Sequence, residues 1–246
     1  MLAERICGEL KDCTVLAIDQ YDWKNKVVAD AIGIVYPVYF WGIPNIVRRF
    51  LEQAVLPKTA YYFSVANMGG FAGNAPAIIS DLLKKRGSTL KASFTIKMPD
   101  NYIVMMSPPT PEVQNKLFDE AEEQVTQIIK VVSAKEETKE PRRNPLFSMV
   151  HNHYRKTFAE RDGGFRVNDK CIACGLCVTV CPVQNIVLEH DAPIWRHHCE
   201  YCMRCLQVCP NEAINYGQKT IGRKRYRNPD FSVDDMIPKK PEGKVD

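Results

Sequence analysis

Eight of the ten cysteines lie between residues 171 and 209, in two runs of the form C-x2-C-x2-C-x3-C-P. The two runs are Cys171, Cys174, Cys177 and Cys181, and Cys199, Cys202, Cys205 and Cys209. Thiolates are ligands for soft metals, and a cytosolic chain rarely maintains disulfides. The clustering and duplication of the cysteines therefore predict a metal centre rather than a disulfide framework.

Residues 165–216 resemble the bacterial ferredoxins that carry two [4Fe–4S] clusters, through KCIACGLCVTVCP at 170–182 and HCEYCMRCLQVCP at 198–210. In such proteins the fourth cysteine of each run binds the other cluster, because three thiolates come from one tight turn and the fourth from another direction. The resemblance implies that cluster I is held by Cys171, Cys174, Cys177 and Cys209, and cluster II by Cys199, Cys202, Cys205 and Cys181.

Structural zinc is the main alternative for these cysteines. Zinc ribbons and knuckles use pairs of cysteine or histidine ligands, which would leave two duplicated four-cysteine runs unexplained. The apolar residues between the cysteines are expected to pack around the clusters and exclude water. They are Ile172, Val178, Val180, Ile186, Ile194, Leu206, Val208 and Ile214.

Five other residues carry interpretations of their own. Trp195 is expected in the core rather than as a redox relay. We interpret His197 and His198 as an exposed polar pair rather than as hydrogen-bond donors to a cluster sulfur. Cys7 and Cys13 are not at metal-ligand spacing, so we interpret them as ordinary small apolar residues.

The elements that precede this segment alternate between strand-like and helix-like patterns. Such alternation predicts a parallel sheet covered by helices on both faces. The predicted helices lie near 2–11, 44–55, 75–86 and 111–133, and the predicted strands near 13–18, 31–36, 59–66 and 89–98.

Two loops follow predicted strands at their carboxyl ends, where open α/β sheets bind ligands. With YPVYFWGIP at 36–44, ANMGGFAGNA at 66–75 and MPDNY at 98–102, the chain resembles the flavodoxin–ferredoxin fusion proteins of anaerobic prokaryotes. The resemblance implies a flavodoxin-like α/β domain with an FMN site before a small α+β two-cluster ferredoxin domain. It places beside the flavin ring Tyr39, Phe40, Trp41 and Gly42, and on its other edge Asn67, Gly69, Gly70, Gly73 and Asn74.

The sequence departs from this family at its start. Flavodoxin-like domains begin with a strand and a hydroxyl- and glycine-rich loop that holds the FMN phosphate at a helix N-terminus. Both are missing here, which would leave the strand at 13–18 without its usual neighbours. We interpret the chain as an N-terminally shortened version of the protein and expect weak FMN binding.

Composition and charge set the remaining expectations. The chain has 246 residues, of which 45% are hydrophobic and 25% charged, as in ordinary globular proteins. The formal net charge is +4, and we interpret the basic run at 219–227 (KTIGRKRYR) as a solvated or partner-docking tail rather than a nucleic-acid site. No apolar stretch reaches the roughly 20 residues of a membrane-spanning helix. We therefore expect a cytoplasmic protein with no membrane span and no nucleic-acid partner.

The expected organisation is an incomplete flavodoxin-like domain at 1–134, a linker with a short helix at 135–163, a ferredoxin-like domain at 164–216 and a basic polar tail at 217–246. The expected function is electron transfer with redox partner proteins through two [4Fe–4S] clusters, which exchange electrons with FMN. The alternative is a flavin-dependent oxidoreductase acting on an unidentified small molecule, so whether the chain is an enzyme stays open. A third hypothesis is that the clusters only staple a protein-binding module.

Overall fold

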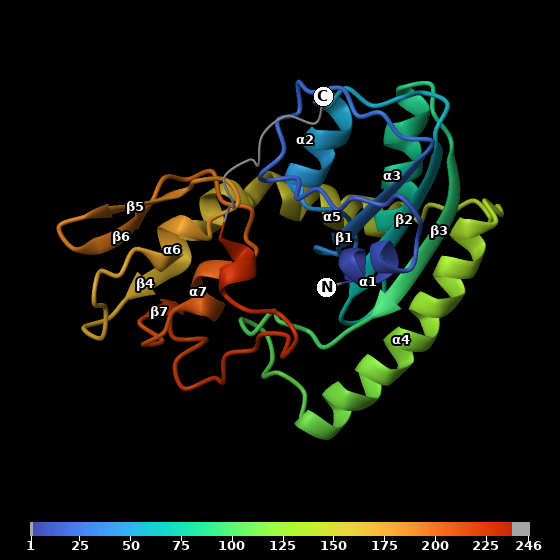
Figure 1. Ribbon diagram of the computed structural model, residues 1–246. Helices are drawn as coiled ribbons and strands as arrows, with labels where there is room; N and C mark the ends of the chain where they lie inside the picture. Colours follow the sequence, from blue (N-terminus) through green and yellow to red (C-terminus); the bar gives the residue numbers. More distant parts are fainter. Residues whose placement is uncertain (1, 238–246) are drawn as a thin grey trace. The chain divides into compact units, whose positions relative to one another are not determined.

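The structure is a computed structural model that describes residues 2–237 (Figure 1). The chain forms two compact units. The first contains the residues up to Asp100 together with Pro109–Arg155, and the second contains Asn101–Pro108 together with the described residues from Lys156 onward. The last residues of the expected basic tail, 238–246, lie outside the described part of the chain.

A three-stranded parallel sheet forms the centre of the first unit, in the order β1-β2-β3. The central strand β2 is buried from residue 61 to residue 66, as expected for a parallel strand covered on both faces. The three strands match those predicted near 31–36, 59–66 and 89–98. They are β1 (Ala31–Pro37), β2 (Tyr61–Met68) and β3 (Leu90–Lys97).

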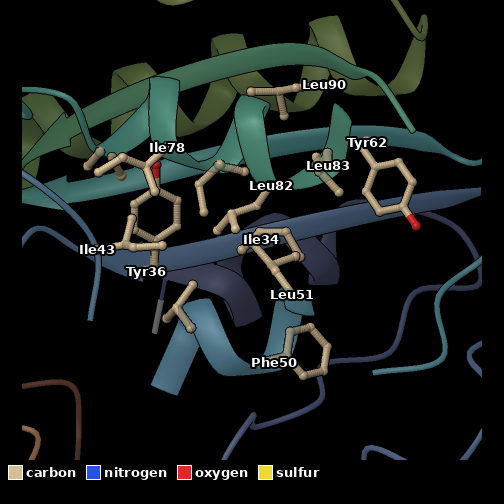
Figure 2. Packing of buried hydrophobic residues seen from close by; sticks show 14 of the residues in the cluster. Ile34, Tyr36, Ile43, Phe50, Leu51, Tyr62, Ile78, Leu82, Leu83 and Leu90 are labelled. Carbon is tan, nitrogen blue, oxygen red and sulfur yellow. The ribbon is translucent and has the colours of Figure 1, made fainter. Parts of the chain in front are cut away.

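Helices cover both faces of this sheet (Figure 1). On one face, side chains of α2 and α3 pack against Ile34, Tyr36 and Tyr62, as Figure 2 shows. On the other face, α1 and α4 pack against Phe63, Val65 and neighbouring residues. Alternate residues of β2 thus enter opposite cores, as the pleat of a strand requires. The helices are α1 (Leu2–Gly8), α2 (Asn45–Gln53), α3 (Ala75–Lys85) and α4 (Pro111–Ser133).

The strand predicted at 13–18 is wrong, because residues 13–17 form no strand. A strand needs a neighbour that pairs with its backbone groups, and none of the described strands pairs with this segment. Its apolar side chains are correspondingly exposed, at 43% for Val15 and 51% for Leu16. The interpretation of Cys7 and Cys13 as ordinary apolar residues is also wrong, because the two are joined by a disulfide.

The charged segment that follows α4, at 134–144, forms hydrogen bonds and an ion pair with the rest of the first unit. Ser93 donates its backbone N–H to the Thr138 hydroxyl at 2.9 Å, and Thr138 donates its own to the Lys91 carbonyl at 3.0 Å. Glu140 forms an ion pair with Lys84. The chain then enters α5 (Pro145–Thr157) and the 3-10 helix η1 (Ala159–Gly164).

The second unit consists of short elements. Strands β4 and β7 pair antiparallel, as do β5 and β6. The basic run at 219–227 is not freely solvated: Thr220 is fully buried, and Arg225 donates to the Ile214 carbonyl at 2.9 Å. The elements are β4 (Phe165–Val167), α6 (Leu176–Thr179), β5 (Ile186–Glu189), β6 (Ala192–Trp195), α7 (Arg204–Val208), β7 (Ile214–Tyr216) and the 3-10 helix η2 (Asp234–Met236).

The segment Asn101–Pro108 belongs to this second unit although residues of the first unit flank it on both sides. Ile103 is fully buried there. Gln207 donates to the Asn101 carbonyl at 2.6 Å, and Arg223 donates to the Ile103 carbonyl at 2.7 Å. Among the described residues, no helix combines the length and the apolar character needed to cross a membrane.

Candidate metal centre

The two cysteine runs fold alike. Three pairs of equivalent positions have left-handed backbone conformations: Ala173 and Tyr201 at φ 52° and 56°, Gly175 and Met203 at 75° and 60°, and Gln184 and Glu212 at 53° and 49°. Residues other than glycine seldom adopt this conformation. It turns successive N–H groups toward one side of the chain. Both runs therefore have the backbone shape of an anion-binding loop. A short helix, α6 or α7, begins after the second position of each run.

The first set of thiols lines one cavity. Cys171, Cys174 and Cys177 of the first run border it together with Cys209 of the second run. Burial raises the pKa of the Cys177 thiol to about 11, and the nearby thiols of Cys174 and Cys209 add to the rise. The structure thus brings together the four cysteines that the resemblance assigns to cluster I.

The second set shows the reciprocal arrangement. Burial raises the pKa of the Cys205 thiol well above its usual value, and Cys202, Cys199, Cys181 and Cys177 contribute in that order. Cys202 also has a raised pKa, for which burial is the largest cause and Cys181 a smaller one. Cys181 of the first run thus contributes to the raised pKa of thiols in the second run.

Backbone N–H groups point at the sulfur atoms. Asn185 donates to Cys181 Sγ at 3.2 Å, and the equivalent residue Ala213 donates to Cys209 Sγ at 3.3 Å. Tyr201 donates to Cys199 Sγ at 3.2 Å. Such bonds favour the thiolate form and are among the factors that set the potential of an iron–sulfur cluster.

The grouping of the thiols bears on the kind of metal site. In the part of the chain that the structure describes, no three His, Cys, Asp or Glu side chains are grouped so as to hold one metal ion. A zinc ion would need its sulfur ligands at about 2.3 Å from a single point. Four thiols that surround a cavity instead suit a larger inorganic group, in which each thiolate binds a different metal atom. The residues present fit a [4Fe–4S] cluster.

The apolar surroundings agree only partly with expectation. Val180, Ile186, Leu206, Val208 and Ile214 are buried. Ile172 and Ile194 are 64% and 40% exposed. Ile172 nevertheless borders the cavity that Cys171, Cys174, Cys177 and Cys209 line. Trp195 stacks on the buried ring of Phe165, with ring centroids 5.2 Å apart.

One important residue carried no signal in the sequence. The buried carboxylate of Asp162 accepts hydrogen bonds from the His197 backbone at 2.9 Å, His197 Nδ1 at 2.7 Å and Asn185 Nδ2 at 2.8 Å. His197 and His198 are both exposed, as expected, but the carboxylate fixes the first of them. Asp162 is isolated in the sequence and 23 residues from Asn185, so no local pattern reveals it.

The loops assigned to a flavin ring lie next to each other at the carboxyl ends of β1 and β2. Their contacts are with other residues of the first unit. The Phe40 ring stacks on Tyr154 with centroids 4.3 Å apart, and Trp41 packs against Phe71 and Phe147. Tyr39 and Gly42 form a β-bridge with each other.

The second loop, at 67–74, also makes its contacts with other residues of the first unit. The Val38 N–H donates to the Asn67 carbonyl at 2.8 Å, and the buried Asn74 amide donates to the Asn144 carbonyl at 2.7 Å. A side chain at Gly69 would strike Asp100, and one at Gly73 would strike Trp41, whereas Gly70 has open space around it.

Comparison with known proteins gives matches to the cysteine-rich segment. Residues 170–216 match the family described as the 4Fe-4S dicluster domain. A ferredoxin of Pyrobaculum islandicum is 40% identical over 50 residues, which are 19% of this chain and 46% of that protein. A ferredoxin of Methanothermococcus thermolithotrophicus is 36% identical over 50 residues, which are 19% of this chain and 83% of that protein. The chain thus spans about half the length of the first relative. No solved structure gives a significant match.

Proposed function

Because this chain belongs to the ferredoxin family through the 4Fe–4S dicluster domain at residues 170–216, we propose that it transfers electrons between redox partner proteins with two [4Fe–4S] clusters. The observation that carries the proposal is the reciprocal arrangement of the two cysteine runs. Cys209 of the second run borders the same cavity as Cys171, Cys174 and Cys177 of the first run. Cys181 of the first run contributes to the raised pKa of Cys199, Cys202 and Cys205 of the second.

The chain's own residues would do three things in this function. Eight thiolates would hold the two clusters, whose iron atoms supply one-electron chemistry when bound. The backbone N–H groups of Asn185, Tyr201 and Ala213 would stabilise negative charge on the sulfur ligands. Buried apolar residues such as Leu206 and Val208 would exclude water from the clusters.

Metal content tests the proposal directly. We expect about eight iron and eight sulfide per chain in anaerobically purified protein, since each cubane contains four of each. Cys181→Ala should damage cluster II, and the matched variant Cys209→Ala should damage cluster I, in electron paramagnetic resonance spectra of the reduced protein. Stoichiometric zinc without inorganic sulfide would overturn the proposal. The opposite pattern of damage would overturn only the crossover assignment.

The proposal includes FMN as a weakly bound exchange partner of the first unit. Its support is the position of the loops at 39–42 and 67–74 next to each other at the carboxyl ends of β1 and β2. Binding would have to compete with Tyr154 and Phe147, which already cover Phe40 and Trp41. This part of the proposal is independent of the clusters.

A further inference from the structure

A cavity in the first unit is lined by five cationic side chains and one carboxylate. It lies between α2, α3 and the segment that contains α5. Asp81 is the carboxylate among its lining residues, and Ser148 and Asn152 are neutral and polar. The cations that line it are Arg48, Lys84, Lys85, Arg143 and Arg155.

Carboxylates offset only part of this positive charge. Arg143 forms an ion pair with Asp81, and Lys84 forms one with Glu140. Arg48 approaches Glu52 at 3.8 Å. Burial lowers the pKa of Arg48, and the neighbouring cations Arg155 and Arg143 lower it further. The repulsion among these groups would be relieved by an anion in the cavity.

His151 lines the same cavity and presents a buried hydrogen-bond acceptor there. Its side chain is 1% exposed, and burial and the charge of Arg48 lower its pKa to about 4. The ring is therefore neutral near pH 7. Its Nδ1 lies 3.2 Å from the Tyr39 carbonyl, which can only accept, so Nδ1 carries the proton. Nε2 is thus a bare acceptor, and it is buried without a partner among the described residues.

A ligand for this cavity must meet three requirements at once. It must be an anion, to match the cations, and it must donate a proton, to satisfy His151 Nε2. The Nε–H of Arg48 is a buried donor that also lacks a partner in the described chain, so the ligand must accept as well. Ionised carboxylates and sulfate accept hydrogen bonds but cannot donate one.

We propose that this cavity binds the phosphate group of inorganic phosphate or of a phosphate monoester. A phosphate monoester has its second pKa near 6, so in mildly acidic to neutral solution it is an anion that still carries an O–H. Its O–H would be donated to His151 Nε2, and its other oxygen atoms would accept from Arg48, Arg155 and Lys85. The cavity lies wholly in the first unit, and the inference does not rest on electron transfer.

Comparison of two anions tests this proposal without any mutation. Isothermal titration of the full chain at about pH 6, with clusters intact, should show saturable binding of phosphate. Sulfate should bind several-fold more weakly although its charge is larger, because it has no proton for His151. Binding that follows charge alone, with sulfate preferred, would overturn the proposal. So would the absence of saturable phosphate binding at millimolar concentrations. Titration with glycerol 2-phosphate then shows whether the free ion or a monoester binds more tightly.

Variants locate the site. Arg155→Gln and Lys85→Gln should each weaken phosphate binding about tenfold, since each removes a charge-assisted contact. Lys116→Gln, which changes an exposed cation on α4 paired only with Glu120, should leave the affinity unchanged. His151→Phe should abolish the preference for phosphate over sulfate. If that variant does not fold, the anion comparison on the unchanged protein remains decisive. Equal effects of Arg155→Gln and Lys116→Gln would overturn the location.

Discussion

At the scale of single residues, the buried carboxylate of Asp162 places a negative charge near the candidate metal centre. Burial raises the pKa of Cys199, and Cys202 and then Asp162 add to the rise. Asp162→Asn removes this negative charge, so the reduced form of the nearer cluster should become easier to reach. We expect its midpoint potential to rise by on the order of tens of millivolts.

A redox titration followed by electron paramagnetic resonance measures this shift. Asp234→Asn, at an exposed position in the same unit and far in sequence from the cysteines, is the matched control and should leave both potentials unchanged. Iron content measured in parallel separates a charge effect from loss of a cluster. An unchanged potential in Asp162→Asn at full iron content would contradict the role given to this carboxylate.

The neutral, buried ring of His151 predicts how stability depends on pH. The unfolded chain takes up a proton at this residue near pH 6.5, whereas the folded chain does so only near pH 4. The unfolded state therefore binds more protons between these values, and the free energy of unfolding should fall as the pH drops from 6.5 toward 4. The loss should reach at most about 3 kcal/mol.

Urea unfolding at several pH values in this range measures the slope. His151→Gln should remove it, and His153→Gln, at an exposed position of the same helix, should retain it. A slope that survives His151→Gln would show that other groups cause it.

At the scale of elements, the left-handed turn before α6 makes a different demand on each run. The first run has Gly175 at φ 75°, and the second has Met203 at φ 60° in the equivalent position. A side chain at Gly175 would meet only Leu188, at 3.8 Å, so sterics with neighbours do not forbid it. Gly175→Ala should nevertheless destabilise the second unit by about 1 kcal/mol through backbone strain.

The control for this prediction is Gly163→Ala, because Gly163 has no neighbour within 4 Å of an added methyl group and its φ is not positive. Denaturation followed by the visible absorbance of the clusters reports on this unit. If both variants lose their absorbance at the same urea concentration, the strain argument is wrong.

The elements also show which structural signals the sequence contains. The three strands of the sheet could be predicted because each contains a short segment rich in apolar, β-branched or aromatic residues. Helix α4 could be predicted from its periodicity over Pro111–Ser133. The segment at 13–18 has the same local character, yet it forms no strand, because pairing depends on a neighbour and not on the segment itself. The repeated cysteine spacing is visible in the sequence because it is local, whereas Asp162 approaches Asn185 and His197 only through the fold.

At the scale of the whole molecule, the aromatic contacts of the first unit predict its behaviour toward flavin. Phe40 and Trp41 already stack with Tyr154, Phe71 and Phe147. A flavin ring would have to displace at least one of these contacts, each worth about 0.5–1.5 kcal/mol beyond burial. We expect the full chain to bind FMN more weakly than micromolar. Fluorescence titration measures the affinity, and sub-micromolar binding would contradict this prediction.

The path of the chain through the two units was not predicted from the sequence. The expected boundaries followed composition, which marks the charged stretch after residue 134. Composition gives no sign that residues 101–108 leave the first unit, because the apolar residues Ile103 and Val104 would suit either core. The hydrogen bonds from Gln207 and Arg223 to this segment depend on residues more than a hundred positions away.

The place of Asn101–Pro108 in the second unit has a consequence for modular inheritance. A gene fragment that encodes only residues 156–246 would lack Ile103, which is fully buried in that unit, and the carbonyl acceptors of Gln207 and Arg223. The fragment would expose apolar surface, and the side-chain N–H groups of Gln207 and Arg223 would lose these two acceptors. The iron–sulfur part of this protein is therefore not a cassette that recombination at a single junction can transplant intact into another gene.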